Sequence, residues 1–137
     1  MKFIFVSHGD LAKSILGSAQ MIVGEQTEAK AFGLYPKDDI GGLKDQVKSA
    51  IEEFGGGNDI IWFTDLFSGS PFNAVVALMG DFPIRHITGM NLPMVLEAFM
   101  SRMNEDNSAE DICTKLLEEA PSTFIDVNHY LGVNLED

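Results

Sequence analysis

Basic residues, cysteines and long apolar runs are all scarce in this chain, and each shortage excludes a class of protein. The 9 lysine and arginine residues face 21 aspartate and glutamate residues, so the net charge is −12 at pH 7. Nucleic acids and anionic membranes are therefore unsuitable partners, because both bind basic side chains. The single Cys113 cannot form an internal disulfide, which excludes a disulfide-stabilised secreted scaffold. No apolar run is long enough to span a bilayer, and we expect no signal peptide and a cytoplasmic protein.

Hydrophobic residues make up 45% of the 137 residues, enough for a normal buried core, so the charge does not indicate disorder. The length is typical of one domain. The sequence contains no internal repeat, low-complexity tract or interdomain linker. We therefore expect residues 1–137 to form a single domain, with residues 128–137 as a C-terminal tail.

Apolar residues alternate between strand-like and helix-like spacing along the chain. Short apolar runs predict strands over residues 2–7, 29–35, 59–64 and 84–88. Helical spacing predicts helices over residues 12–23 and 43–54, then three more that begin near Ser70, at residues 90–93 and at Ser108. This alternation is typical of an open, doubly wound α/β sheet with helices on both faces. Residues 123–127 are a candidate for one further short strand.

Ligands of such sheets bind outside the carboxyl ends of the strands, where the strand order reverses. His8 follows the first predicted strand and Asp65 follows the third. In the strand order 2-1-3-4 these two strands are neighbours, so we expect the two side chains to face each other. A carboxylate that accepts a proton from one imidazole nitrogen fixes the tautomer and leaves the other nitrogen free as a nucleophile.

Gly69 and Ser70 open the third predicted helix, with Ser70 as the expected N-cap and proline next. Free backbone N–H groups, a hydroxyl and the helix dipole would stabilise a phosphoryl group there. These loops contain no lysine, arginine or Walker-type glycine loop, so nucleotide binding is not supported. His8 and Asp65 are too few ligands for a zinc site, and we expect neither a metal nor a cofactor. A phosphoryl group that arrives on another protein fits better.

Three motifs follow the predicted strands in order. They are Ser-His-Gly at residues 7–9, Asp65 followed by Gly-Ser-Pro-Phe-Asn at residues 69–73, and Gly-Met-Asn-Leu-Pro-Met at residues 89–94. Together they resemble the enzyme IIA domain of the mannose-type bacterial sugar phosphotransferase system, over roughly residues 1–130. Members of that family commonly have two glycines before the Ser-Pro-Phe-Asn run, whereas residues 66–69 read Leu-Phe-Ser-Gly here.

The resemblance implies a cytoplasmic phosphocarrier. A histidine that matches His8 accepts phosphate from the carrier protein HPr and passes it to a IIB component, which serves the membrane subunits IIC and IID. Asp65 matches the carboxylate beside that histidine, and Ser70 matches a hydroxyl near the phosphoryl group. The family fold has four parallel strands and a fifth, antiparallel strand that is exchanged between the subunits of a dimer. Residues 123–127 would be that strand, and IIB would be a separate polypeptide.

Two other functions fit the same residues. The phosphotransferase subunit of dihydroxyacetone kinase uses the same fold, and a non-enzymatic regulatory module could bind a metal or small molecule through His8 and Asp65. Asp10 is expected to cap the first helix, whereas His86, His129 and Cys113 are expected to have structural or surface roles.

The negative charge is concentrated at one end of the sequence. Residues 1–104 contain 12 acidic and 8 basic residues, a net charge of −4. Residues 105–137 contain 9 acidic residues and one lysine, a net charge of −8. All three loops of the candidate site precede this acidic region, so we expect the surface around His8 to be only mildly acidic.

Overall fold

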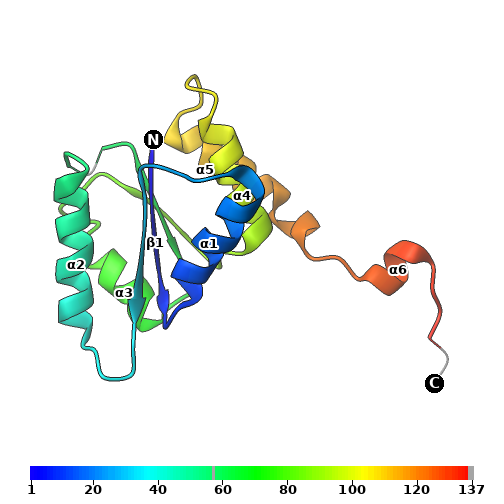
Figure 1. The fold of residues 1–137 in the computed structure, drawn as a ribbon, viewed down its shortest axis with the longest axis horizontal. Helices are drawn as coiled ribbons and strands as arrows, with labels where there is room; N and C mark the ends of the chain where they lie inside the picture. Colours follow the sequence, from blue (N-terminus) through cyan, green and yellow to red (C-terminus); the bar gives the residue numbers. More distant parts are fainter. Residues whose placement is uncertain (57, 136–137) are drawn as a thin grey trace.

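The computed structural model describes residues 1–56 and 58–135 of the chain. Four strands form one parallel sheet in the order β2-β1-β3-β4 (Figure 1). They are β1 (Lys2–His8), β2 (Ala29–Leu34), β3 (Ile60–Thr64) and β4 (Arg85–Thr88). The predicted sheet and its strand order are therefore confirmed.

Helices cover both faces of this sheet. The longer helices are α1 (Leu11–Val23), α2 (Ile40–Glu53), α3 (Ser70–Val76), α4 (Leu92–Arg102) and α5 (Ala109–Glu119). Figure 1 shows α1, α4 and α5 on one side of the strands and α2 and α3 on the other. Each layer has its own apolar core, so the sheet is buried on both faces, as is typical of parallel sheets.

Side chains alternate between the two cores along each central strand. Phe3, Phe5 and Phe63 point to the α1 side, where the rings of Phe5 and Phe63 stack with centroids 5.1 Å apart. Ile4 and Trp62 point to the opposite core against α2 and α3. All of β3 is buried, which is why its sequence is apolar throughout rather than alternating.

Two predicted helix ends are confirmed. Gly24 ends α1 with φ of +87°, a conformation that glycine adopts without steric cost. Ser108 and Asp111 form the predicted capping box at the start of α5, each accepting the other's backbone N–H.

Two other predicted helix starts differ in detail from the structure. Asp10 is the N-cap residue of α1 as predicted, but its side chain makes no capping bond, and the hydroxyl of Ser7 accepts the Ala12 N–H at 2.7 Å instead. The N-cap of α3 is Gly69 rather than Ser70, because Gly69 is extended and its carbonyl already accepts the Asn73 N–H at 2.9 Å. Ser70 is therefore the first helical residue.

The strand predicted over residues 123–127 is absent from the single chain. Residues Ala120–Thr123 form a 3₁₀ helix, η1, and Val127–Leu131 form α6. A strand needs a neighbour for its backbone hydrogen bonds, and α6 lies apart from the rest of the molecule (Figure 1). We call residues 124–135 the C-terminal arm. Its exposed apolar side chains are Phe124, Ile125, Val127, Tyr130, Leu131, Val133 and Leu135.

A small polar cluster lies between the sheet and α3. The Thr64 hydroxyl is 2.7 Å from His86 Nε2 and donates to the Thr88 hydroxyl at 2.8 Å. The ring of Phe72, on α3, packs against His86 with centroids 5.0 Å apart. Burial lowers the pKa of His86 from 6.5 to about 4, so the folded protein holds this imidazole neutral well below the pH at which an unfolded chain would protonate it.

This pKa shift predicts a loss of stability in mild acid. Between pH 6.5 and about 4 the unfolded chain binds a proton that the folded chain excludes, so the free energy of unfolding falls as the pH falls. From about pH 7.5 to about pH 5 we expect this one group to cost about 1 kcal/mol, after allowance for solvent screening. Denaturant unfolding of the wild type and His86→Gln at both pH values measures it. Equal losses in the two proteins would show that His86 does not contribute.

Candidate active site

His8 and Asp65 come together at the carboxyl edge of the sheet. His8 is the last residue of β1, and Asp65 directly follows β3. These strands are neighbours in parallel register, with Val6 opposite Thr64. Asp65 Oδ2 lies 2.8 Å from His8 Nδ1 and accepts the His8 backbone N–H at 2.9 Å. One carboxylate oxygen therefore holds both the backbone and the ring of His8.

The two partners differ in exposure. The Asp65 side chain is 9% exposed, whereas that of His8 is 50% exposed. An ionised carboxylate only accepts hydrogen bonds, so the Nδ1 of His8 carries the proton of this pair. Nε2 is then the unprotonated nitrogen of the neutral ring, available to an electrophile. The other Asp65 oxygen, Oδ1, is buried and has no hydrogen-bond partner within the described part of the chain.

Gly69 lies against the imidazole. A Cβ at Gly69 would be 3.0 Å from His8 Cε1 and 3.7 Å from Nε2, so glycine leaves open the space beside the free nitrogen. Ser70 follows with an exposed side chain. Leu66 and Phe67, in the same loop, are 59% and 72% exposed, and they form an apolar rim next to Asp65.

The turn that carries His8 is packed directly against β2. Gly9 donates its N–H to the Leu34 carbonyl at 2.7 Å. A Cβ at Gly33 would lie 2.1 Å from the Gly9 carbonyl oxygen, so only glycine permits this approach. The Ser7 hydroxyl donates to the His8 carbonyl at 3.0 Å. The His8 turn is therefore held by backbone contacts on its β2 side and by Asp65 on its β3 side.

A hollow of about 400 Å³ borders His8 on the β2 side, lined by His8, Gly9, Leu34, Tyr35, Pro36 and Asp38. The Tyr35 hydroxyl donates to Asp10 Oδ1 at 2.5 Å and accepts from Lys13 Nζ at 3.1 Å. Sequence reasoning found no basic residue in the site loops and missed Lys13, which comes from the first turn of α1. The spacing of residues along the sequence does not reveal this contact, because Lys13 is on α1 and Tyr35 follows β2, 22 residues later.

The third motif, residues 89–94, contacts the end of β3 rather than His8. Gly89 donates its N–H to the Thr64 carbonyl at 3.0 Å. Asn91 caps α4 by accepting the Met94 N–H at 2.9 Å, and its amide donates to the Thr123 hydroxyl at 3.0 Å. Asn91 therefore ties the start of α4 to the base of the C-terminal arm.

The other candidate nucleophiles lie elsewhere. His86 is bonded within the sheet, and His129 lies on α6. Cys113 is buried on α5, and burial raises the pKa of its thiol. Within residues 1–56 and 58–135, no group of three or more histidine, cysteine or acidic side chains could hold a metal ion. In the same described ranges, no helix is long and apolar enough to span a membrane.

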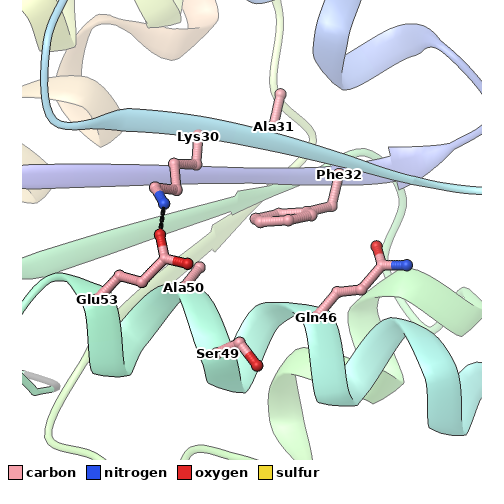
Figure 2. A pocket seen from close by; sticks show the side chains of 7 residues that line it. All are labelled: Lys30, Ala31, Phe32, Gln46, Ser49, Ala50 and Glu53. Atoms are coloured by element: carbon pink, nitrogen blue, oxygen red, sulfur yellow. Dashed lines mark hydrogen bonds and ion pairs between the residues drawn. The ribbon is translucent and has the colours of Figure 1, made fainter.

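A second hollow, of about 450 Å³, lies between β2 and α2 and contains none of the site residues (Figure 2). Figure 2 shows Lys30 paired with Glu53 across it and Phe32 over the helix. Its lysine already has an acidic partner, and the hollow contains no histidine or cysteine. This hollow therefore offers no candidate nucleophile, and the candidate site remains the carboxyl edge around His8.

The sequence model of the family described as the fructose IIA component of the phosphoenolpyruvate-dependent sugar phosphotransferase system (PTS) matches residues 2–116. The chain belongs to this mannose-type IIA family. The match contains His8, Asp65, Gly69 and Ser70. The family acts in phosphotransfer during sugar uptake, and a phosphotransferase role in general follows for this IIA component.

Known relatives agree with this assignment. The sorbose-specific EIIA component of Lacticaseibacillus casei is 35% identical over 105 residues, which cover 76% of this chain and 75% of the relative. The mannose-specific EIIAB component of Escherichia coli K12 is 26% identical over 113 residues, which cover 82% of this chain but 35% of that longer protein.

Solved structures agree as well. The EIIA component of Streptococcus agalactiae superposes with a TM-score of 0.84 at 25% identity, over 93% of this chain and 98% of that one. The mannose/sorbose-specific IIA subunit of Enterococcus faecalis gives a TM-score of 0.81 at 26% identity, over 99% and 96% of the two chains. The IIA fold thus extends over nearly the whole chain.

The approach of β2 to the His8 turn makes Gly33 a sensitive position in this IIA component. Gly33→Ala would place a methyl group 2.1 Å from the Gly9 carbonyl oxygen, where backbone meets backbone and neither moves cheaply. We expect a loss of about 1–3 kcal/mol in the free energy of unfolding. Gly17→Ala is the matched control, because the added Cβ would meet nothing within 4 Å beyond its neighbouring residues and the backbone of its own helix. It should raise stability by up to about 1 kcal/mol. Similar effects of the two substitutions in denaturant unfolding would contradict the close contact.

Proposed function

We propose that this IIA component is a cytoplasmic phosphocarrier that accepts a phosphoryl group on His8 Nε2 and passes it to a IIB component for sugar uptake. The observation that carries the proposal is the 2.8 Å contact between His8 Nδ1 and a buried carboxylate, with the ring itself half exposed. This arrangement leaves one oriented nitrogen open to a partner protein.

The reaction moves one phosphoryl group between two imidazoles. The lone pair of His8 Nε2 attacks the phosphorus of a phosphohistidine on HPr. A new N–P bond forms as the N–P bond of the donor breaks, and the electron pair of that bond returns to the donor nitrogen. Positive charge therefore disappears from the donor ring and arises on the His8 ring. Asp65 stabilises that charge through Nδ1–H, and transfer to a histidine of IIB reverses each change.

Gly69 and Ser70 are proposed to hold the phosphoryl oxygens. The absence of a side chain at Gly69 gives the group room beside Nε2. Ser70 is the first residue of α3, where backbone N–H groups have no partner within the helix, and its exposed hydroxyl adds a further donor. No metal or cofactor is part of this mechanism.

The proposed partners are HPr and a separate IIB subunit, with the membrane subunits IIC and IID served indirectly and no role for nucleic acid. Residues 1–137 are proposed to form a single IIA domain with a tail at residues 128–137. The charge distribution suits protein partners, since residues 1–104 have a net charge of only −4. The named relatives are components of sugar systems, which does not favour a dihydroxyacetone kinase subunit or a metal-binding module.

We further propose a homodimer in which the C-terminal arm of each subunit packs on the other. Phe124 is 82% exposed and Ile125 is 62% exposed in the single chain. Such a run of apolar side chains is expected to be covered by a protein surface. Residues 123–127 would become the antiparallel strand only when a second copy supplies the neighbouring backbone.

Loss of His8 is expected to abolish phosphorylation. Incubation with enzyme I, HPr and labelled phosphoenolpyruvate should give an acid-labile, base-stable phosphate on the wild type and none on His8→Ala. Asp65→Asn should be labelled about 10²-fold more slowly or worse, because the charge that fixes and stabilises the ring is lost. His129→Ala, which removes an exposed histidine on α6, should be labelled like the wild type. Full labelling of His8→Ala would contradict the assignment.

Polar substitutions in the arm are expected to weaken the dimer. Phe124→Ser with Ile125→Ser removes two apolar side chains from the proposed contact, so the protein should shift towards monomer at concentrations where the wild type is dimeric. Light scattering coupled to gel filtration measures the mass. Met103→Ser is a matched control, because Met103 is 82% exposed but lies outside the arm. A wild type that is monomeric at every concentration would contradict the proposed dimer.

A further inference from the structure

Three side chains outside the family motifs form a hydrogen-bonded chain beside His8. Asp10 accepts from the Tyr35 hydroxyl at 2.5 Å, and Lys13 donates to the same hydroxyl at 3.1 Å. The Lys13 ammonium also lies over the Tyr35 ring, 5.2 Å from its centroid. The chain therefore runs from an acid through a phenol to a base, and it joins the start of α1 to the end of β2.

The side chain of Asp10 has no helix-capping role that would explain its orientation. Asp10 is the N-cap residue of α1, but only its carbonyl bonds the helix, by accepting the Ser14 N–H at 2.8 Å. The Ala12 N–H goes to the Ser7 hydroxyl. Asp10 is exposed and lies two residues after His8 in the same turn. An unpaired carboxylate at this position would repel a phosphoryl dianion on His8.

Tyr35 is held firmly in the orientation that reaches Asp10. Its backbone N–H donates to Asp38 Oδ2 at 3.0 Å, and its carbonyl accepts the Asp38 N–H at 2.9 Å. Tyr35 and His8 line the same hollow of about 400 Å³. Tyr35 is therefore part of the rim of the candidate site, with its backbone held by the turn to Asp38 and its hydroxyl bonded to Asp10 and Lys13.

We propose that Tyr35 is a positioning residue for phosphoryl transfer at His8. Its hydroxyl holds the Asp10 carboxylate away from the free imidazole nitrogen, and Lys13 offsets the charge of that carboxylate through the same oxygen. The phosphoryl dianion then meets a rim whose nearest acid in the His8 turn is already paired. This inference rests on the proposed function, since it concerns the group that His8 would carry.

The test measures the initial rate of phosphorylation by limiting phosphorylated HPr. Tyr35→Phe keeps the ring and removes only the hydroxyl, which frees Asp10. We expect a rate about threefold to tenfold lower at low salt, the effect of letting one existing unit charge move closer to the phosphoryl group at the edge of a solvated site. In about 1 M salt, where the Debye length is about 3 Å, the difference from the wild type should shrink to less than about twofold.

Removal of the charge separates this role from simple packing. In an Asp10→Asn background, Tyr35→Phe should change the rate less than about twofold, because no charge is left to be released. Ser49→Ala is the control, since it removes an exposed hydroxyl on α2, outside both the site and the C-terminal arm. It should match the wild type at both salt concentrations.

The outcomes distinguish this inference from the proposed function. A wild type that accepts no phosphate would overturn the proposed function itself. A wild type that is phosphorylated at the same rate as Tyr35→Phe would overturn only the role of Tyr35. A slow Tyr35→Phe whose defect is unchanged by salt, or by Asp10→Asn, would also overturn it, because a packing defect does not depend on the charge of Asp10.

Discussion

The hydrogen bonds from His8 to the Asp65 carboxylate are the interaction on which the arrangement of this molecule depends. One oxygen of a carboxylate that is only 9% exposed holds the backbone N–H and the ring of His8 at 2.9 and 2.8 Å, which requires β1 and β3 to be adjacent and in register. Because parallel neighbours need crossover connections, that adjacency in turn requires helices on both faces and a core behind each. The strand order, the two apolar layers and the exposed imidazole thus form one linked set of constraints.

Much of this could be predicted from the sequence, because the signals are local or follow from topology. Buried runs such as β3 indicate strands, and the strand order then brings His8 to Asp65. The start of α3 differs from the prediction by one residue, since the extended Gly69 takes the N-cap position, where glycine is only slightly less favourable than serine. The Asp10–Tyr35 contact could not be predicted, because it depends on side-chain packing between α1 and β2. The conformation of the C-terminal arm could not be predicted from a single chain, because a strand there needs a neighbouring backbone for its hydrogen bonds.

Two glycines near His8 are required because they leave space, not because they adopt an unusual backbone conformation. At Gly33 and Gly69 the requirement is space, since a Cβ would meet the Gly9 carbonyl oxygen at the first and the His8 ring at the second. At Gly33 the missing side chain lets β2 approach the His8 turn, and at Gly69 it leaves space beside the ring. The ring is therefore oriented by Asp65 without a bulky group that would obstruct an approaching protein.

The Ser7 side chain holds the two ends of the turn that contains His8 together. Its buried hydroxyl accepts the Ala12 N–H at 2.7 Å and donates to the His8 carbonyl at 3.0 Å, so a short loop that contains the nucleophile is tied to the body at both ends. Ordering a loop at the moment of binding costs conformational entropy in every encounter. Here that cost is met once, during folding. If His8 meets two different proteins in turn, as proposed, neither encounter has to order this loop again.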